Sequence, residues 1–535
     1  MLKAHSKHIS YEETGKFSSL IHAYLNRDPS LTDFFSHYPD LDGIKNVIED
    51  RKKFPTNRKL IKEVFEEAYA EISATDLQKK NIESLLSENT FTVCTAHQPN
   101  IFTGYLYFIY KTAHTIVLAK KLNNEFPDAH FVPVFYIGSE DNDFDELSRF
   151  KINGKLFRWN TQQQGAVGRM KVDKNLINLI EQIEGELAHL PFAKELIATL
   201  RKAYSLGVDV AQATFILLNE LFCSEGLLVL QPDLPSLKNS MKSIFKDDLL
   251  HGTPFGIVDK TNEKLEEKFS LQVNARPINL FYLRDQIRNR IDKRGNVYSV
   301  DGTNIRFTEK EILEELNQHP ERFSPNVILR GLYQETILPN IAFIGGGSEV
   351  AYWMQLKALF NHYHVPFPVL VLRNSFIIMN SKQEHKMTEL GISIADLFKD
   401  ETVLANEMVV KWTDKPLSLN NEALQSKQLF VHLKKLAGSV DKSLVQHVHA
   451  LETDMLKKID SLEKKMLRAE RKTQTVQLQR IWKLKSELFP SNNLQERVDN
   501  FMPYYASYGK SLIECILDQS LSLEQQFILM IVDER

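Results

Sequence analysis

Residues 91–111, FTVCTAHQPNIFTGYLYFIYK, constrain the fold more than any other stretch of this 535-residue chain. They open with residues 91–95, whose aromatic and β-branched side chains indicate a buried strand. Pro99 ends that strand, because proline has no N–H to donate to a sheet. After Gly104, apolar residues three and four positions apart indicate a helix, with Thr103 as its expected N-cap. Strand, polar loop and helix form the first half of a βαβ unit, in which ligands bind beyond the carboxyl ends of the strands.

Four polar side chains lie in or near this turn: His97, Gln98, Asn100 and Lys111. Side chains in such a position serve either as caps and turn residues or as contacts to a substrate. This stretch alone leaves both interpretations open.

A second buried strand is predicted over residues 130–137, a continuous apolar run typical of a parallel strand covered on both faces. The acidic loop that follows carries five carboxylates, on Glu140, Asp141, Asp143, Asp145 and Glu146. They would either complement the positive end of a helix or bind a cation, such as a substrate ammonium group, a metal ion or a proton in transit. We favour the cation, because this loop should lie beside the turn at 96–100 in a βαβ unit.

Residues 151–325 alternate short strand-like segments, including 226–233 and 279–283, with amphipathic helices. These strands would either extend the same sheet or form an inserted subdomain, and the pattern leaves both open. Asp233 ends one of them and is equally a turn residue or a site residue. A basic cluster follows, at Arg284, Arg288, Arg290, Lys293 and Arg294. A solvated hairpin is a commoner reason for such a run than an anionic ligand.

The sheet pattern returns with strands predicted at 326–330, 341–344 and 366–373. Between the second of these strands and a helix at 350–360 lie three glycines, Gly345, Gly346 and Gly347. Glycines in this place let the backbone approach an anion, although a tight turn alone could also require them. Their spacing matches neither a dinucleotide fingerprint nor a Walker loop. Because the last strand ends in Arg373, the polar groups that end all these strands would share one rim.

The C-terminal third is predicted to be mostly helical. Residues 379–400 have no regular pattern, and residues 420–488 form a long helical region. Apolar positions from Leu444 to Val476 follow a heptad seam with one extra four-residue step, which relaxes a left-handed supercoil. The seam would join either two antiparallel helices or one helix and a second chain.

Composition narrows the class of protein. The chain is 43% hydrophobic and 25% charged, as soluble globular proteins are, and its length indicates two to four domains. A net charge of −3 argues against a nucleic-acid partner held by bulk electrostatics. No apolar run is long enough to span a membrane, and the N-terminus lacks the apolar core of a signal peptide. The three cysteines are far apart and match no metal-binding spacing. We therefore expect a cytoplasmic protein with no membrane partner and no metal ligands.

Five motifs occur in order ahead of the heptad region. They are Gln98-x-x-Ile101-Phe102-Thr103-Gly104-x-Leu106-Tyr107-x-Ile109-Tyr110-Lys111, Val132-Pro133-Val134-Phe135 with Glu140-Asp141-x-Asp143-Phe144, Pro325-Asn326-Val327-x-Leu329-Arg330, Pro339-x-Ile341-Ala342-x-Ile344-Gly345-Gly346 with Glu349-x-Ala351-Tyr352-Trp353-x-Gln355-Leu356-Lys357, and Pro368-Val369-Leu370-Val371-x-Arg373. With these motifs the chain resembles, over nearly its full length, the bacillithiol-biosynthesis cysteine-adding enzymes, a family of cysteine ligases.

The resemblance implies an α/β fold: a Rossmann-like parallel sheet core with connecting insertions, plus an α-helical coiled-coil arm. We accordingly expect an N-terminal helical cap over 1–90, the first half of the core over 91–150, further core strands and a connecting insertion over 151–325, the second half of the core over 326–378, the coiled-coil arm over 379–493, and a C-terminal helix packing on the core over 494–535.

The resemblance also implies the activity, which is to join the carboxyl group of L-cysteine to the amine of glucosaminyl-malate through an amide bond, giving bacillithiol. The implied partners are these two small molecules and a second copy of the chain, held as a homodimer through the coiled coil. Because the family is associated with ADP, a nucleotide (ATP or ADP) is expected. The consumption of ATP and a metal requirement stay open.

The expected site uses His97, Glu140 and Asp141 as catalytic residues. Substrate-binding residues are expected at Gln98, Asn100, Tyr107, Lys111, Asp143, Gly345, Gly346, Gly347, Glu349, Tyr352, Gln355 and Arg373. The chain departs from the family pattern at Asn142, where the family commonly has histidine, and at His97, where it usually has glutamine. It departs again at Gly347-Ser348, where the family usually has proline and glycine. We hypothesise that His97 supplies the imidazole that Asn142 does not.

Two other functions fit the same sequence, because fold does not determine chemistry. One is another nucleotide-dependent transferase on a Rossmann-like core. The other is a non-enzymatic coiled-coil dimer that binds a metabolite as a sensor.

Overall fold

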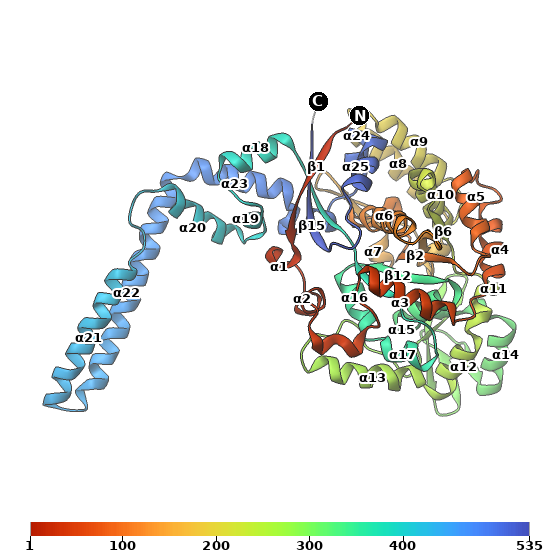
Figure 1. Ribbon diagram of the computed structural model, residues 1–535, viewed down its shortest axis with the longest axis horizontal. Coiled ribbons are helices and arrows are strands. Elements are labelled where there is room, and N and C mark those ends of the chain that lie inside the picture. Colours follow the sequence, from red (N-terminus) through yellow and green to blue (C-terminus); the bar gives the residue numbers. More distant parts are fainter. Residues whose placement is uncertain (1, 534–535) are drawn as a thin grey trace. The chain divides into compact units, whose positions relative to one another are not determined.

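The computed structural model describes residues 2–533, which fall into two compact units (Figure 1). The first unit runs to Asn380 and resumes at Asn493, and the second spans Ser381–Asn492.

Five parallel strands form the central sheet of the first unit, in the order β13-β12-β2-β3-β6. They are β2 (Thr90–His97), β3 (His130–Ile137), β6 (Leu228–Leu230), β12 (Asn340–Gly345) and β13 (Val369–Leu372). Numbered along the chain, the sheet reads 3-2-1-4-5, the order of a Rossmann-like sheet, and the order reverses between β2 and β12. The predicted fold class and the strands predicted at 91–95, 130–137 and 341–344 are confirmed.

The core of this sheet is apolar because both faces of the strands are covered. Helices α3 (Leu41–Lys52) and α6 (Tyr107–Glu125) pack on it, and their side chains form one cluster with those of the strands. Val47, Leu118 and Ile344 are members of that cluster with no exposed surface.

The remaining helices of the first unit surround the sheet. They are α1 (Tyr11–Thr14), α2 (Ser19–Leu25), α4 (Arg58–Tyr69), α5 (Asp76–Ser84), α7 (Phe144–Leu147), α8 (Lys174–Leu187), α9 (Ala193–Ala203), α10 (Val210–Phe222), α11 (Pro235–Lys238), α12 (Lys242–His251), α13 (Thr253–Glu266), α14 (Glu309–Gln318), α15 (Val327–Ile337), α16 (Gly347–Met354), α17 (Lys357–His362), α24 (Met502–Tyr508) and α25 (Lys510–Gln519). Most of residues 1–90 are helical, as predicted.

Residues 151–325 contribute to two different sheets. The strand predicted at 226–233 is β6 and belongs to the central sheet, whereas the strand predicted at 279–283 is β7 and belongs to a separate antiparallel sheet. That sheet has the order β10-β9-β8-β7-β11, from β7 (Leu280–Arg284), β8 (Ile287–Arg294), β9 (Val297–Val300), β10 (Arg306–Thr308) and β11 (Phe323–Pro325). Strands β4 (Arg149–Ile152) and β5 (Lys155–Arg158) form a further hairpin. Each of the two alternatives therefore holds for part of this segment.

A small sheet joins the two ends of the described chain. Strand β15 (Gln526–Val532) lies between β1 (Ala4–Ser10), with which it pairs antiparallel, and β14 (Ser375–Asn380), with which it pairs parallel. The sequence predictions of a helical N-terminal cap and a C-terminal helix missed β1 and β15.

Two local predictions are wrong. Residues 326–330 begin helix α15 rather than a strand, with Asn326 Oδ1 accepting the backbone N–H of Ile328 at 2.9 Å. Helix α6 begins at Tyr107 and Thr103 does not cap it, because Phe102 and Thr103 adopt left-handed backbone angles, with φ of 51° and 67°.

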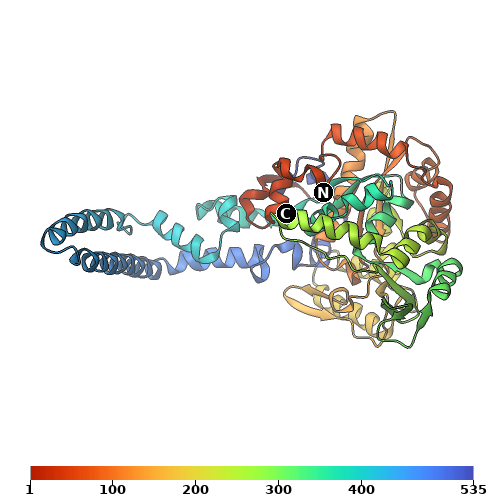
Figure 2. The same cartoon turned by 90° about the horizontal axis from the view of Figure 1, so that it is seen from below.

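The second unit is helical throughout its length. Its helices are α18 (Ser381–Glu389), α19 (Ile394–Phe398), α20 (Glu401–Trp412), α21 (Asn420–Val440), α22 (Leu444–Thr473) and α23 (Thr475–Leu488). Helices α18 and α19 correct the prediction that residues 379–400 are irregular. Helices α21 and α22 form an antiparallel pair within the chain (Figure 2). An ion pair between Lys434 of α21 and Glu452 of α22 joins the two helices. No helix in the described residues is long and apolar enough to cross a membrane.

Candidate functional site

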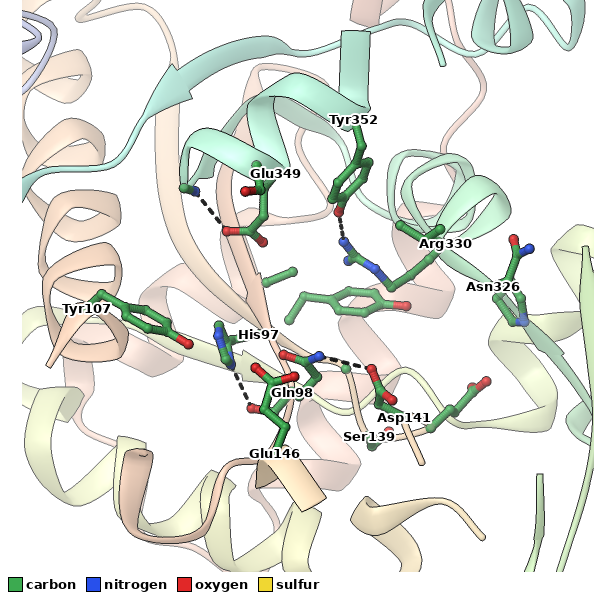
Figure 3. Close-up of a pocket in the computed structure, with 18 of the residues that line it drawn as sticks. His97, Gln98, Tyr107, Ser139, Asp141, Glu146, Asn326, Arg330, Glu349 and Tyr352 are labelled. Carbon is green, nitrogen blue, oxygen red and sulfur yellow. Dashed lines mark hydrogen bonds between the residues drawn. The ribbon is translucent and has the colours of Figure 1, made fainter. Parts of the chain in front are cut away.

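A cavity of about 590 Å³ opens at the carboxyl ends of the central strands (Figure 3). It lies at the point where the strand order reverses, since residues after both β2 and β12 line it. Its volume is typical of a site for a small molecule. This is where ligands of open parallel sheets bind.

His97 ends β2 and lies against the rings of Tyr107 and Phe108. Burial, together with the charge of Lys111, lowers the pKa of His97 to about 4, so the ring is neutral at pH 7. Its Nδ1 lies 3.1 Å from the carbonyl oxygen of Gln98. Because a carbonyl only accepts, Nδ1 carries the proton and Nε2 keeps a lone pair.

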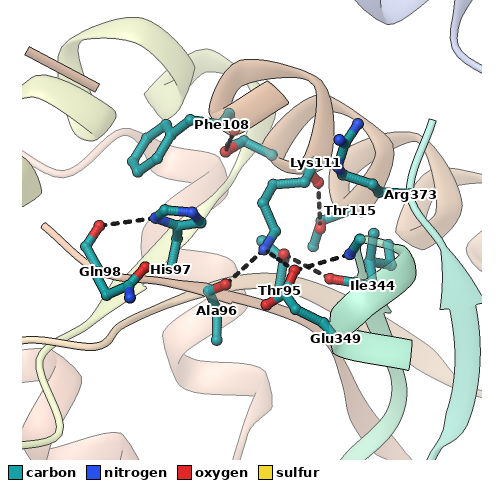
Figure 4. A network of polar contacts seen from close by, with 12 residues as sticks. Thr95, Ala96, His97, Gln98, Phe108, Lys111, Thr115, Ile344, Glu349 and Arg373 are labelled. Atoms are coloured by element: carbon teal, nitrogen blue, oxygen red, sulfur yellow. Dashed lines mark hydrogen bonds and ion pairs between the residues drawn. The ribbon is translucent and has the colours of Figure 1, made fainter. Parts of the chain in front are cut away.

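Lys111 is fully buried and connects β2 to α16 through two hydrogen bonds (Figure 4). Its Nζ donates to the carbonyl of Ala96 at 2.7 Å and to Oε2 of Glu349 at 2.8 Å. The same carboxylate oxygen accepts the N–H of Gly346 at 2.8 Å and so caps α16. Burial raises the pKa of Glu349, but the charge of Lys111 and the hydrogen bonds from Lys111 and Gly346 together outweigh it, and the net pKa is lowered. The Lys111 ammonium predicted to bind an anion is therefore neutralised within the protein.

Arg373 lines the cavity but is also paired. Its Nη1 and Nη2 donate to the two carboxylate oxygens of Glu496 at 2.9 and 2.7 Å, and both side chains are buried. The guanidinium carbon lies 5.1 Å from the ring centroid of Tyr107. The guanidinium of Arg373, which we expected to bind substrate, thus pairs with a carboxylate of the chain itself.

The acidic loop after β3 forms another wall of the cavity. Gln98 Nε2 donates to Asp141 Oδ2 at 3.0 Å, which joins the loops after β2 and β3. Glu140 Oε1 lies 2.6 Å from the buried ammonium of Lys238. Glu140 Oε2 and Ser139 Oγ are buried and have no hydrogen-bond partner among residues 2–533. This wall therefore presents two carboxylates and a hydroxyl to a ligand.

Asp233, the other strand-ending carboxylate, lies below this wall. It forms a two-point ion pair with Arg169, at 2.6 and 2.9 Å, and lies 3.5 Å from Lys238. It supports the site from outside the cavity, which it does not line.

The remaining wall comes from α15, α16 and β8. Asn326 and Arg330 of α15 line it with Tyr352 of α16, whose hydroxyl accepts a hydrogen bond from Arg330 (Figure 3). Arg288 of β8 donates to Ser324 Oγ at 3.0 Å and to Asn142 Oδ1 at 2.9 Å. Arg497 adds a further guanidinium to the lining.

The structure brings most of the predicted site residues together. Those that line the cavity are His97, Gln98, Tyr107, Glu140, Asp141, Gly346, Gly347, Glu349, Tyr352 and Arg373. Those outside the lining are Asn100, Lys111, Asp143, Gly345 and Gln355.

Asp143 and Gln355, outside the lining, make structural hydrogen bonds instead, whereas the buried side-chain amide of Asn100 has no hydrogen-bond partner in residues 2–533. Asp143 Oδ1 accepts the N–H of Glu146 at 3.2 Å and caps α7, which is the alternative considered for the acidic loop. The Gln355 amide bonds to Asn262 and to the backbone of residues 272 and 273. Asn100 is buried beneath Gly104, where an added Cβ would lie 2.7 Å from its amide nitrogen.

Sequence reasoning missed Ser139, Arg288, Asn326, Arg330 and Arg497. Arg288 stood in the basic cluster that we attributed to a solvated hairpin, and one of its five members does reach the cavity. Asn326 and Arg330 lie four residues apart, which places them on one face of a helix. Had 326–330 been taken as a helix, this spacing would have identified both.

No group of three or more His, Cys, Asp or Glu side chains in residues 2–533 is placed to hold a metal ion. The three cysteines are free thiols, and burial raises the pKa of Cys94 well above its usual value.

The fold and site define a Rossmann-like protein with a coiled-coil domain and a cavity lined by charged side chains at the carboxyl ends of the sheet. Two family models match the chain: "Bacillithiol biosynthesis BshC, N-terminal Rossmann-like domain" over residues 4–374 and "Bacillithiol biosynthesis BshC, C-terminal coiled-coil domain" over residues 376–532. The chain belongs to the bacillithiol biosynthesis BshC family.

Curated relatives match over almost the whole length. Proteins from Flavobacterium johnsoniae and Flavobacterium psychrophilum are each 39% identical, and one from Christiangramia forsetii is 38% identical. Each alignment covers 97% of this chain and 98% of the relative, and each relative bears the name "Putative cysteine ligase BshC". These matches support a role as a ligase in bacillithiol biosynthesis.

Proposed function

We propose that the chain joins the carboxyl group of L-cysteine to the amine of glucosaminyl-malate, forming the amide bond of bacillithiol. The observation that supports this most directly is a single cavity that presents carboxylates on one wall and guanidinium groups on others. Both proposed substrates carry an amine and at least one carboxylate, so these walls complement them in charge.

Amide formation from a carboxylate and an ammonium ion is uphill in water, so the carboxylate must be activated. We propose that a nucleoside triphosphate supplies the activation. The carboxylate oxygen attacks phosphorus and gives either an acyl phosphate and ADP or an acyl adenylate and pyrophosphate. The amine then displaces phosphate or AMP from the carbonyl carbon and releases one proton.

The residues of the cavity would serve these steps as follows. Glu140 and Asp141 hold the cysteine ammonium through charge-assisted hydrogen bonds. Neutral His97 accepts a hydrogen bond from the attacking amine at Nε2, and Asp141 accepts the released proton. Holding both reactants in one cavity contributes roughly 7–11 kcal/mol to lowering the barrier.

We also propose that the chain forms a homodimer through α21 and α22. Apolar side chains on this pair remain exposed, including Leu451 at 48% and Met455 at 43% of their surface. A second copy that packs on them would bury this surface, as in other coiled coils.

The test is to incubate the pure protein with L-cysteine, glucosaminyl-malate and ATP and to measure bacillithiol by mass spectrometry. We expect Asp141→Asn to lower the rate by about 100-fold or more. The matched control is Asp145→Asn, because Asp145 lies four residues further on in α7, outside the cavity, and pairs with Arg158.

The same incubation separates the other functions. No product under any nucleotide condition would favour a metabolite-binding scaffold. A product that lacks the cysteinyl group would favour a transferase. Equal rates for Asp141→Asn and the parent protein would remove Asp141 from the chemistry.

A further inference from the structure

Arg330 is a half-buried arginine of the cavity wall whose guanidinium is only partly hydrogen-bonded. Its Nη2 donates to the hydroxyl of Tyr352, and its guanidinium carbon lies 5.9 Å from the ring centroid of Tyr136. Its Nη1 is buried and has no hydrogen-bond partner in the part of the chain that the structure describes. The side chain lines the cavity (Figure 3).

Three other arginines that are buried or half-buried have carboxylate partners. Arg51 lies 2.7 Å from Glu335, Arg373 lies 2.7 Å from Glu496, and Arg169 lies 2.6 Å from Asp233. Arg288, a further buried arginine of the cavity wall, has none in contact within residues 2–533, but its guanidinium donates to Ser324 and Asn142. Within residues 2–533, no carboxylate oxygen lies within 4.0 Å of the Arg330 nitrogens. A buried charge without a counter-ion is costly in free energy. An anion that enters the cavity and contacts Arg330 would therefore stabilise this guanidinium.

The surroundings of Arg330 indicate the kind of anion. Burial raises the pKa of Tyr136, with Glu140 raising it further and Arg330 opposing, so both charges lie close to this tyrosine. Glu140 Oε2 and Ser139 Oγ are the other unpartnered polar atoms of the lining at this end. A planar guanidinium matches a carboxylate, while Glu140 and Ser139 match an N–H or O–H donor.

We infer that Arg330 is the carboxylate-binding residue of the cavity and that Tyr352 positions it. Its ligand is a small molecule that carries a carboxylate and an amine. This inference rests on the proposed function, since L-cysteine and glucosaminyl-malate are the two sources of such a carboxylate. It assigns the contact to a residue on α15 rather than to Arg373 or Lys111, whose charges the chain already neutralises.

The experiment measures binding by isothermal titration, with no turnover required. L-cysteine is compared with cysteamine, which lacks the carboxylate, and glucosaminyl-malate is compared with methyl glucosaminide. We expect Arg330→Gln to weaken binding of one carboxylate compound by about 10- to 150-fold and to leave its carboxylate-free counterpart unchanged. A loss for L-cysteine identifies the amino acid as the source, and a loss for glucosaminyl-malate identifies the malate group.

Two further variants distinguish binding from folding. Tyr352→Phe keeps Arg330 but removes the hydroxyl that orients it, so we expect a smaller loss for the same compound. Arg290→Gln is the charge-matched control, because Arg290 is exposed and lies outside the cavity. In the ligand-free protein Arg330 has no carboxylate in contact. The Arg330→Met variant should therefore unfold at the same temperature as the parent or at a higher one.

Affinities of Arg330→Gln within twofold of the parent for both carboxylate compounds would overturn the inference. So would a parent protein that binds neither compound. Arg330-dependent binding without bacillithiol formation would leave this inference standing and overturn the ligase. Unchanged bacillithiol formation and unchanged binding in Arg330→Gln would overturn this inference and leave the ligase proposal standing.

Discussion

At the scale of single residues, the charges around the cavity fall into two groups. Lys111, Lys238 and Arg373 each contact a carboxylate of the chain, whereas Arg288 and Arg330 contact none in the described residues. The sequence showed which charged residues stand at strand ends, because strand ends follow from hydrophobic patterning. It could not show which charges neutralise one another. Glu496 lies 123 residues from Arg373, and that pairing depends on the tertiary fold.

The Arg373–Glu496 pair gives the first prediction. Arg373→Met leaves a carboxylate with no exposed surface and no counter-ion, so we expect a loss of about 3–5 kcal/mol in the free energy of unfolding. Replacing both residues, Arg373→Met with Glu496→Met, should cost less, since no buried charge remains unpaired. Urea unfolding followed by circular dichroism measures both. A double variant at least as unstable as Arg373→Met would contradict this account.

His97 gives a prediction about pH. Its pKa is about 4 in the folded protein and about 6.5 in an unfolded chain, so between these values the unfolded state binds the extra proton. The contribution of His97 to stability is complete above pH 6.5. It decreases as the pH falls towards 4, by up to about 3 kcal/mol in total.

The measurement is the free energy of unfolding from pH 4.5 to 7 for the parent and for His97→Gln. We expect stability to decrease more steeply on acidification in the parent, by up to about 1 kcal/mol per pH unit. Comparing slopes removes the other titrating groups, such as Asp248, whose burial raises its pKa to about 7. Parallel slopes would show that His97 titrates normally when folded.

At the scale of elements, the first two of the three glycines at the start of α16 differ in their packing. None has a positive φ, so backbone conformation does not explain them. A Cβ on Gly345 would lie 2.8 Å from the ring of Phe343, which is stacked on Trp353, and 2.9 Å from Cβ of Glu349. On Gly346 the nearest atom would be Nε of Arg373, at an ordinary 3.5 Å.

We therefore expect Gly345→Ala to lower the free energy of unfolding by about 1–3 kcal/mol, because the packed ring must move. Gly346→Ala, the matched control, should change it by less than about 0.5 kcal/mol. Thermal unfolding of both variants checks this. Equal destabilisation would show that the turn itself requires glycine at both positions.

The same scale shows where sequence patterning is ambiguous. Val327, Ile328 and Leu329 form a short apolar run that suits a buried strand as well as a buried helix. The cap at Asn326 and the 11-residue length of α15 distinguish the two, and the apolar run reveals neither. The longer strands β2 and β3 gave no such difficulty, because β2 is rich in β-branched and aromatic residues, β3 is a continuous apolar run, and turn residues follow both.

At the scale of the whole molecule, the parallel sheet could be predicted because each buried strand is a local pattern. The terminal sheet could not. Strand β1 has only one buried residue among its seven and pairs with β15, more than 500 residues away along the chain. Such a partner is visible only in the folded chain. The antiparallel partner of α22 was likewise left open by the heptad seam, which suits α21 or a second chain equally well.

The division into two units leads to the last prediction, in which a Gly-Ser linker of about six residues replaces residues 381–492. The chain on either side of this segment is held together within the first unit. Ile378 N–H donates to Gln495 Oε1 at 2.8 Å, and Gln495 Nε2 donates to the carbonyl of Ile378 at 3.0 Å. The cavity is lined only by residues of the first unit.

We therefore expect the shortened protein to fold and to bind L-cysteine and glucosaminyl-malate with affinities within about twofold of the parent. If α21 and α22 form the homodimer, light scattering should show a dimer for the parent and a monomer for the shortened protein. Ligand affinity and oligomeric state are measured independently, so each unexpected result contradicts one part of the prediction only. A shortened protein that remains dimeric would place the dimer interface on the first unit. A monomer that has lost binding would show that the cavity needs the second unit or the partner chain for its function.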